Sequence, residues 1–500
     1  MRRIPLLSGS RIPVVSFPDD TVLLAPPPPL DALADVRAAV SEALRYPLAG
    51  PPLAAVATRG GRATIVVEPP SLPLPGAEDD PRRDALAAVV DELARVGVAP
   101  ERHTVLVAGG LERRASRAQL ERLLRPGRAR DFRGAVTTHD CEADDLVRLT
   151  TTEGVSVTAH RALVDTDVVV CVTAAETVLR GGPAALLGAC GAGAIRAATA
   201  DSLLEAGTAR GWRMATAVEA ALAAGRPVLG VSVLLDLPRG SGPHRGYPWA
   251  PGALEELAGS GLRRALNAAP DPLRRRVLQR STRELRAVAV LAGRPSVAHA
   301  EALLRAIELR GIRLEAPLDA IVVPLPWKGP HQPREPLDAI TASSVGLGLA
   351  LRLWRDRPPL AEGGTVVLLH PFPRTVGHGP QAPYRTLLTA LREAPGGRLR
   401  QAEALAARDR RAIAAYRAGR APHPRLPFAD WESCSPVLER AGRVIVAGCR
   451  DAGAARALGF VPSHNPATAL EMARGLAGES GRIGVLLAPP YAPLLVGSTV

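Results

Sequence analysis

Lysine is almost absent from this chain of 500 residues, because Lys328 is its only lysine and all the other basic side chains among 62 are arginines. The excess of Ala, Arg, Gly and Pro is typical of a GC-rich coding bias. A lysine ammonium can lose its proton when it is desolvated, whereas an arginine guanidinium keeps its charge. The single lysine, which lies near Trp327 and His331, therefore suggests a chemical role. The alternative is a chance surface position.

Paired cysteines and long apolar runs are also absent. The chain has five cysteines, an odd number without CxxC spacing, which excludes a disulfide framework or a zinc knuckle. No stretch offers the roughly 18 uninterrupted apolar residues of a membrane span, and the first residues lack a hydrophobic signal core. We therefore expect a cytoplasmic protein that contacts no membrane.

Aromatic residues make up only 3% of the chain, although the formal net charge is +13. A nucleic-acid groove normally combines a basic stripe with aromatic stacking platforms. Here the arginines are scattered and their short clusters, such as 274–276, contain no aromatic residue. We expect no nucleic-acid partner, and the oligomeric state stays open.

The chain is too long for one hydrophobic core, and its pattern is typical of an α/β protein. Apolar strands over 62–68, 104–108, 164–172 and 228–235 alternate with helices such as 84–96. This alternation predicts parallel-type sheets that helices cover on both faces. We place an N-terminal α/β domain at 1–310 and a C-terminal α/β domain at 311–500, with a ligand cleft between them.

Two glycine-containing loops follow strands of the first domain and could bind an anion. Gly109 and Gly110 open a loop that includes Arg113, and Arg180 precedes a second glycine pair. Glycines let a backbone approach a phosphate closely, and arginine supplies charge. We therefore take these four residues as candidate cofactor-binding residues. The alternative for the first loop is a tight turn without a ligand. The alternative for the second loop is that small residues let the helices pack closely.

The stretch 321–356 reads as an apolar strand, a polar loop and a long apolar helix. The loop carries Lys328 and His331 next to Trp327, and a second loop after the strand at 365–370 carries Arg374 and His378. Loops after strand ends form the ligand crevice of α/β sheets. These residues could form a site, or they could form hydrogen-bonded loops without chemistry.

Several segments occur in an order that resembles the nickel-dependent lactate racemase family. They are AVSEALRYPLAGPPLAAVA at 39–57, THDCEADDLVRLTTTEGVSV at 138–157, VAVLAGRPSVAHAEA at 288–302, EPLDAI at 335–340, EGGTVVLLH at 362–370 and RALGFVPSHNPATALEMA at 456–473. The resemblance implies two α/β domains with the active site between them. It also implies a nickel-pincer nucleotide tethered to a lysine, and two histidines that move the α-proton of a 2-hydroxy acid.

The positions that carry this chemistry in the family are mostly replaced here. Glu112 stands at the first proton-transfer histidine, Val178 at the second, Gly188 at the tethering lysine and Leu204 at the metal-binding histidine. Other replaced positions of the family pattern are Pro69, Leu72, Ala342, Ser343 and Gly346. Apolar side chains cannot perform general acid–base catalysis. We therefore predict no metal site, and the cofactor stays unknown.

Two hypotheses follow for the function. In the first, the chain is a divergent racemase or epimerase for a small 2-hydroxy acid or similar anion. Lys328, His331 and His378 would then be catalytic, and Arg374 and Trp327 would bind the substrate, with Arg180 as an alternative partner for its carboxylate. In the second, the chain is an inactive relative that senses or binds a small ligand.

Overall fold

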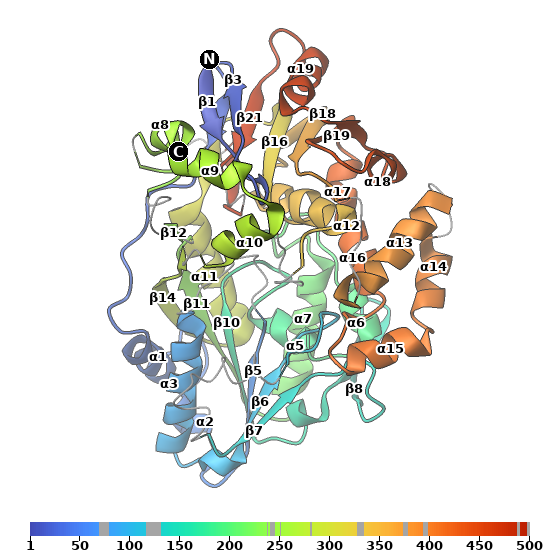
Figure 1. The fold of residues 1–500 in the computed structure, drawn as a ribbon. Helices are drawn as coiled ribbons and strands as arrows, with labels where there is room; N and C mark the ends of the chain where they lie inside the picture. Colours follow the sequence, from blue (N-terminus) through green and yellow to red (C-terminus); the bar gives the residue numbers. More distant parts are fainter. Residues whose placement is uncertain are drawn as a thin grey trace.

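The computed structural model describes most of the chain. The described residues are 1–69, 80–116, 132–237, 239–240, 246–250, 252–280, 283–327, 335–373, 379–393, 399–487 and 491–497. They form two large sheets that lie one above the other in Figure 1, each covered by helices, and several smaller sheets of two or three strands. The mixed α/β class with largely parallel sheets confirms the sequence prediction.

The first sheet has six strands in the order β14-β11-β10-β5-β6-β7, and only β14 runs antiparallel to its neighbour. The strands are β5 (Ala63–Val67), β6 (His103–Val107), β7 (Ala135–Thr138), β10 (Val168–Ala174), β11 (Val228–Leu235) and β14 (Ala287–Gly293). β5 and β10 are buried throughout, because helices cover both of their faces.

Helices α1 and α3 pack on one face of this sheet, and α5, α6 and α7 belong to the core on the other face. Alternate side chains of β5 enter the two cores, since Ile65 and Val67 contact the first group and Val66 the second. The helices are α1 (Val36–Arg45), α2 (Leu53–Val56), α3 (Pro81–Arg95), α5 (Pro183–Leu187), α6 (Ala192–Ala197), α7 (Arg210–Ala223) and α11 (Pro295–Arg310), and the hairpin beside them is β8 (Val147–Thr152) and β9 (Val155–Ala159).

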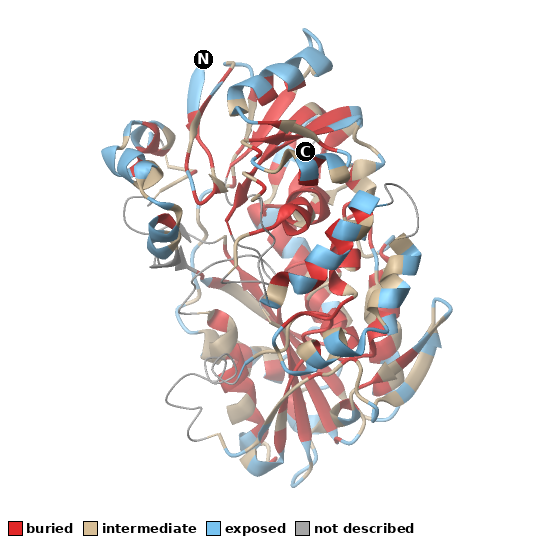
Figure 2. Ribbon diagram, turned by 45° about the vertical axis from the view of Figure 1, so that its right-hand side comes forward, coloured by how far each residue is buried: buried red, intermediate tan, exposed pale blue. Residues whose placement is uncertain are grey.

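The second sheet is parallel and follows the order β20-β19-β18-β16-β21-β4, with β2 also pairing with β16. The strands are β2 (Ser8–Gly9), β4 (Val22–Leu24), β16 (Leu318–Pro326), β18 (Leu360–Leu369), β19 (Arg443–Ala447), β20 (Val461–Ser463) and β21 (Ile483–Leu486). Figure 2 shows the buried residues concentrated in the strands of both sheets.

Two groups of elements cover the second sheet. The hairpin of β1 (Arg2–Pro5) and β3 (Val14–Phe17) packs on one face together with α19 (Pro466–Ala477). The other face packs against the core that contains α12 (Ala339–Ser343), α13 (Ala382–Glu393), α16 (Leu426–Glu432), α17 (Ser435–Leu438) and α18 (Ala452–Ala457). The remaining elements are α8 (Ala253–Gly259), α9 (Gly261–Ala268), α10 (Asp271–Arg280), α14 (Leu399–Ala406), α15 (Arg410–Arg417), β12 (Arg239–Gly240), β13 (Arg283–Glu284), β15 (Ile312–Leu314), β17 (Trp354–Arg355) and β22 (Leu494–Val496), with short 3-10 turns between them.

The first 24 residues therefore pair with strands from the second half of the chain. β4 pairs with β21, and β2 pairs with β16. The sequence analysis assigned these residues to the domain at 1–310, because local patterns do not reveal such long-range pairing. The boundary between 310 and 311 remains a prediction.

The long helix expected up to residue 356 is wrong in its length. A helical stretch begins at α12, continues as a π-helix over Ser344–Leu349 and a 3-10 turn over Ala350–Arg352, and gives way to β17. Two glycines, Gly346 and Gly348, lie in the π-helical part, where glycine weakens the ordinary α-helix.

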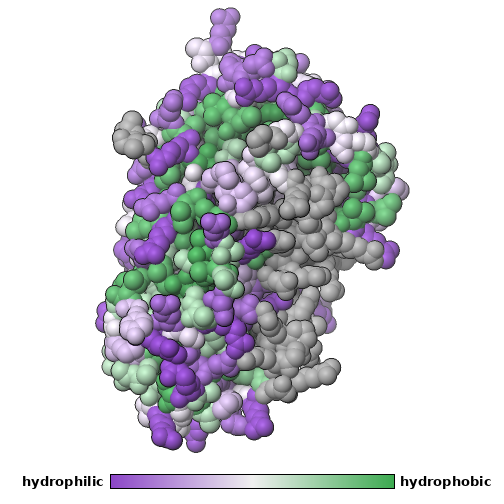
Figure 3. Space-filling model, turned by 90° about the vertical axis from the view of Figure 1, so that its left-hand side faces the viewer, coloured by the Kyte–Doolittle hydropathy of each residue, from purple (hydrophilic) through white to green (hydrophobic). Residues whose placement is uncertain are grey.

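All five cysteines are buried and free. Among the described residues no helix combines the length and hydrophobicity that a membrane span needs. On the face shown in Figure 3, hydrophilic side chains are interspersed with hydrophobic ones, although grey atoms cover part of the view.

Candidate functional site

Charged residues gather at the carboxyl ends of the strands in the first sheet. The chain proceeds from β5 to β6 and β7 on one side and then returns to β10 and β11 on the other. The direction reverses between β5 and β10, and ligands of open α/β sheets bind at such a reversal. Glu68 directly follows β5, and Glu176 lies two residues after β10. The sequence thus places two carboxylates beside this crevice.

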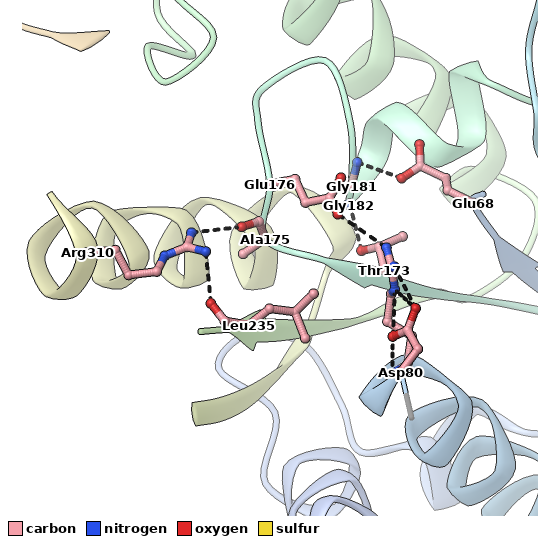
Figure 4. Close-up of polar contacts among 10 residues, drawn as sticks. Glu68, Asp80, Thr173, Ala175, Glu176, Gly181, Gly182, Leu235 and Arg310 are labelled. Atoms are coloured by element: carbon pink, nitrogen blue, oxygen red, sulfur yellow. Dashed lines mark hydrogen bonds and ion pairs between the residues drawn. The ribbon is translucent and has the colours of Figure 1, made fainter. Parts of the chain in front are cut away.

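Arg82 joins Glu176 to the beginning of α3 (Figure 4). Its Nη1 donates to Glu176 Oε1 at 3.2 Å, and its Nη2 donates to Asp80 Oδ2 at 2.6 Å. Asp80 also caps α3, since its Oδ1 accepts from the backbone N–H of Arg82 at 3.0 Å. Burial raises the pKa of Glu176, and Arg82 opposes this shift. The arginine is therefore committed to two carboxylates of its own chain.

The turn at Gly181 and Gly182 binds the chain's own polar groups. The N–H of Gly181 donates to Glu68 Oε2 at 2.7 Å, and the N–H of Gly182 donates to Thr173 Oγ1 at 2.9 Å. Both glycines have positive φ, 94° and 52°, and a Cβ on Gly181 would lie 2.2 Å from Cε1 of His299. Only glycine fits here, and the anion that this turn binds is a glutamate side chain.

Glu68 has the acid–base property that a proton-transfer site needs. Burial raises its pKa to about 7, while Arg180 lowers it and Glu176 raises it further. Its side chain is only partly exposed at the end of β5. A carboxyl that titrates near neutral pH beside a sheet crevice is a functional-site candidate.

Arg180 does not offer a free cation either. Its Nη2 donates to Oε1 of Glu112 in a close ion pair, and Glu112 is buried. The resemblance predicts a histidine at position 112, and the carboxylate found there pairs instead with the arginine that we expected to bind a cofactor.

The loop at Gly109 and Gly110 is also held by the chain itself. Gly110 has a φ of 55°, its N–H donates to the carbonyl of Gly188 at 3.0 Å, and its carbonyl accepts from Tyr416 Oη at 3.1 Å. Arg113 follows with a partly exposed side chain. These contacts favour the alternative of a structural turn, and a cofactor-binding role for the four predicted residues remains untested.

A further charged group closes the crevice on the side of β11. Arg310, at the end of α11, is buried and donates to the carbonyls of Leu235 at 2.8 Å and Ala175 at 3.4 Å (Figure 4). Burial lowers its pKa to about 10, although Asp236 and Glu176 oppose this shift. Arg310 therefore fixes the ends of β10 and β11 to one another.

The second sheet has its own reversal between β16 and β21, and the predicted catalytic loop follows β16 there. Trp327 is buried, with 5% of its surface exposed, and its carbonyl accepts from the N–H of Leu337 at 2.9 Å. The sites predicted at Lys328, His331, Arg374 and His378 lie outside the described residues. The structure brings Trp327 to the expected strand end and leaves the role of the other four as predictions.

A second acidic group lies in the core of the second domain. Asp338 caps α12, since its Oδ1 accepts from the N–H groups of Ile340 at 2.9 Å and Thr341 at 3.0 Å. Burial raises the pKa of Asp338 to about 6, and the backbone donors oppose this. Tyr384 Oη donates to Asp430 Oδ2 at 2.6 Å. Burial raises the pKa of Tyr384, and the negative charges of Asp430, Asp338 and Glu112 raise it further. Asp338 in the second domain and Glu112 in the first therefore both act on the phenol of Tyr384.

Sequence reasoning missed Glu68, Asp80, Arg82, Glu176 and Asp338. A usable signal was present for three of them. Glu68 directly follows a buried strand, and Asp80 and Asp338 precede helices as acidic capping residues. Arg82 and Glu176 carried no such signal, because only the fold brings α3 beside β10.

The nickel-pincer nucleotide that the resemblance implies does not fit these residues. Val178 and Leu204 replace two histidines and lie in the same hydrophobic cluster as the core of the second domain, with 0% and 6% exposure. A Cβ on Gly188, at the position of the tethering lysine, would lie 3.1 Å from the carbonyl of Ala108. The described residues contain no group of three His, Cys, Asp or Glu side chains arranged to hold a metal ion.

Comparisons with known proteins agree with the architecture. Residues 10–181 match the model of the lactate racemase N-terminal domain. The structure of the lactate racemase apoprotein from Thermoanaerobacterium thermosaccharolyticum is similar, with a TM-score of 0.60, 14% identity and coverage of 99% of this chain and 100% of that chain. A Thermotoga maritima protein has a TM-score of 0.47 and 10% identity, over 92% of this chain and 97% of that chain. No curated protein matches the sequence significantly.

Proposed function

Residues 10–181 match the lactate racemase N-terminal domain and the fold is similar to that of the lactate racemase apoprotein, so we propose that this chain is a divergent member of the family that transfers protons without the nickel-pincer nucleotide. The observation that carries the proposal is Glu68, a carboxyl with a pKa of about 7 at the reversal point of the first sheet. The proposed reaction is racemisation or epimerisation of a small 2-hydroxy acid or a similar molecule.

Glu68 suits general acid–base catalysis because both of its forms are populated near neutral pH. A general base works best when its pKa is close to the working pH. The N–H of Gly181 stabilises the carboxylate form at 2.7 Å and fixes the orientation of the side chain. Glu68 would take a proton from the substrate carbon and hold it on its carboxyl group.

Racemisation also requires a proton donor on the opposite face of the substrate. The proposal assigns this role to Lys328, His331 or His378, whose loops belong to the second domain. The substrate carboxylate needs a cation, and Arg82 and Arg180 are engaged by carboxylates of this chain. Arg374 is therefore the proposed partner for a small anionic ligand, with Trp327 at the edge of the site.

Exchange of the substrate α-proton in deuterated water tests this proposal. We expect NMR to show exchange for at least one compound in a panel of 2-hydroxy acids, and a loss of about 100-fold in the variant Glu68→Gln. Glu219→Gln is the matched control, because Glu219 is also a buried carboxyl with a raised pKa but binds Ser296, away from the crevice. Exchange that persists in Glu68→Gln would contradict the role of Glu68.

The same experiment with Lys328→Met tests the second domain. A loss of racemisation with retained exchange of one enantiomer is expected if Lys328 donates from the opposite face. Unchanged racemisation would remove Lys328 from the mechanism and direct attention to His331 and His378.

A small-ligand sensor or binding module is the second candidate function. It is favoured by the contact between the domains, because the apolar residues Val178, Leu203 and Leu204 join the core of the second domain at the place of the family's catalytic groups. Calorimetric binding of a compound from the panel without any proton exchange would support this alternative. A cytoplasmic location, inferred from the free cysteines, is part of either proposal.

A further inference from the structure

One helical segment of the second domain packs against the first domain. Residues 399–432 contain α14, α15, a connector and α16, and we name this segment the strap. Its helix α15 packs against α6 of the first domain, since Tyr416 and Ala192 share one buried cluster, and Figure 1 shows the two helices near one another. The loops after β6 and β7 and helix α6 are its contact partners.

The strap holds the loop after β6 by two hydrogen bonds to backbone carbonyls. Tyr416, which is fully buried, donates from Oη to the carbonyl of Gly110 at 3.1 Å. The N–H of His423 donates to the carbonyl of Leu111 at 2.9 Å. Glu112, the partner of Arg180, follows Leu111 in this loop, so the second domain fixes a part of the candidate site in the first.

Apolar packing reinforces this contact. Leu111, Cys141 and Ala192 of the first domain form one buried cluster with Tyr416 and Leu426 of the strap. Burial of apolar surface from both domains stabilises the closed contact, since separation would expose the cluster to water.

Ion pairs surround the apolar cluster. Arg196 donates to both carboxylate oxygens of Glu403 at 2.8 and 3.0 Å, and it also contacts Glu432. His423 Nε2 lies 3.0 Å from Glu142 Oε1. On the same side Arg417 pairs with Asp140 at 3.2 Å, and Arg114 donates to the carbonyl of Arg417 at 2.8 Å. The Arg196–Glu403 pair is largely shielded from solvent, and its two parallel hydrogen bonds specify a single geometry.

A second anchor joins the domains through different residues. Arg352 is buried and donates to carbonyls of both domains, to Asp201 at 3.0 Å and to Gly348 and Ser433 at 3.1 Å each. Its own carbonyl accepts from the N–H of Leu203 at 2.8 Å. The cluster that contains Leu203 and Leu204 continues into the second domain.

The strap and Arg352 hold different segments of the first domain, the loop at 110–112 and the residues 201–203. A rotation of one domain about either contact as a hinge would therefore break the hydrogen bonds of the other contact. We infer that the strap and Arg352 lock the two domains in one relative orientation, so that the strand-end site is formed permanently rather than by domain closure. This goes beyond the proposed function, and its test needs neither substrate nor activity.

Distance measurements between the domains test the inference directly. Spin labels on Tyr46→Cys and Leu476→Cys report on the two domains, since both side chains are exposed and the five native cysteines are buried. We expect one narrow distance distribution in the full chain. Two populations, or a broad distribution, would overturn the inference.

Hydrogen exchange tests the strap itself. The variant Tyr416→Phe keeps the ring and removes the hydrogen bond to Gly110, and we expect the amides of Gly110 and Glu112 to exchange about tenfold faster. Tyr46→Phe, at an exposed position, is the matched control and should leave them unchanged. Unaltered exchange in folded Tyr416→Phe would show that the strap does not hold the loop.

Discussion

At the scale of single residues, one substitution has two consequences for the site. Glu112 removes the histidine that the family resemblance implies, and its carboxylate neutralises Arg180. Similarly, Glu68 occupies the N–H of Gly181, which could otherwise bind an external anion. Carboxylates of the chain thus occupy the positions where we expected an anionic cofactor, and removal of either partner would leave an uncompensated buried charge.

The raised pKa of Glu68 predicts a specific dependence of stability on pH. Its pKa rises from 4.5 in the unfolded chain to about 7 in the folded protein. Between these pH values the folded state binds more protons, so the free energy of unfolding falls as pH rises. Glu68→Gln cannot ionise, and we expect it to be about 1–3 kcal/mol more stable than the parent at pH 8 but equal to it at about pH 3.5, below the unfolded pKa.

Urea unfolding at both pH values measures this difference. Glu219→Gln controls for the loss of a different buried carboxyl. A difference between Glu68→Gln and the parent that does not change with pH would contradict the raised pKa.

At the scale of elements, the helical stretch at 339–352 shows how tertiary contacts change a local pattern. Its apolar residues predict one long helix, but the structure inserts a π-helical turn at Ser344–Leu349. A Cβ on Gly348 would lie 2.0 Å from Oγ of Ser433, and a Cβ on Gly346 would lie 2.7 Å from Leu368. The glycines are required because neighbouring elements approach the backbone closely.

Two glycine substitutions separate helix propensity from packing. Gly348→Ala should destabilise the protein by about 1–3 kcal/mol, because the clash with Ser433 outweighs the gain in propensity. Gly475→Ala, in α19 with open space around its Cβ position, should stabilise it by about 0.5–1 kcal/mol. Thermal unfolding measures both, and equal effects of the two substitutions would refute the packing explanation.

At the scale of the whole molecule, the two domains share one continuous apolar contact at the former place of the family's chemistry. Val178 and Leu204 belong to the cluster that includes the core of the second domain. Apolar side chains therefore fill this contact, where the resemblance led us to expect cofactor-binding polar groups. The fold remains similar to that of the lactate racemase apoprotein.

Metal analysis tests this conclusion on the intact protein. We expect far less than one nickel ion per chain after expression in nickel-supplemented medium, because histidine ligands and the lysine tether are replaced. The lactate racemase of Thermoanaerobacterium thermosaccharolyticum, loaded under the same conditions, is the positive control. Stoichiometric nickel in this chain would disprove our interpretation of Val178, Gly188 and Leu204.

The amino-acid sequence by itself determined the α/β class and most buried strands. The apolar run at 228–235 coincides with β11, which is buried along its whole length, because a strand buried on both faces needs a continuous apolar run. The replacement of the family's catalytic positions stays a prediction, because it depends on the alignment that the resemblance implies.

Only the tertiary structure decided which charges meet. Arg82 and Glu176 are 94 residues apart, and Tyr416 lies 306 residues from Gly110. Such pairs depend on the order of strands and on the contact between domains, and neither is encoded in local periodicity. The physical reason is that the local pattern of apolar residues shows which side chains are buried. Which distant residues contact each other depends instead on how the buried faces of the sheets and helices pack together.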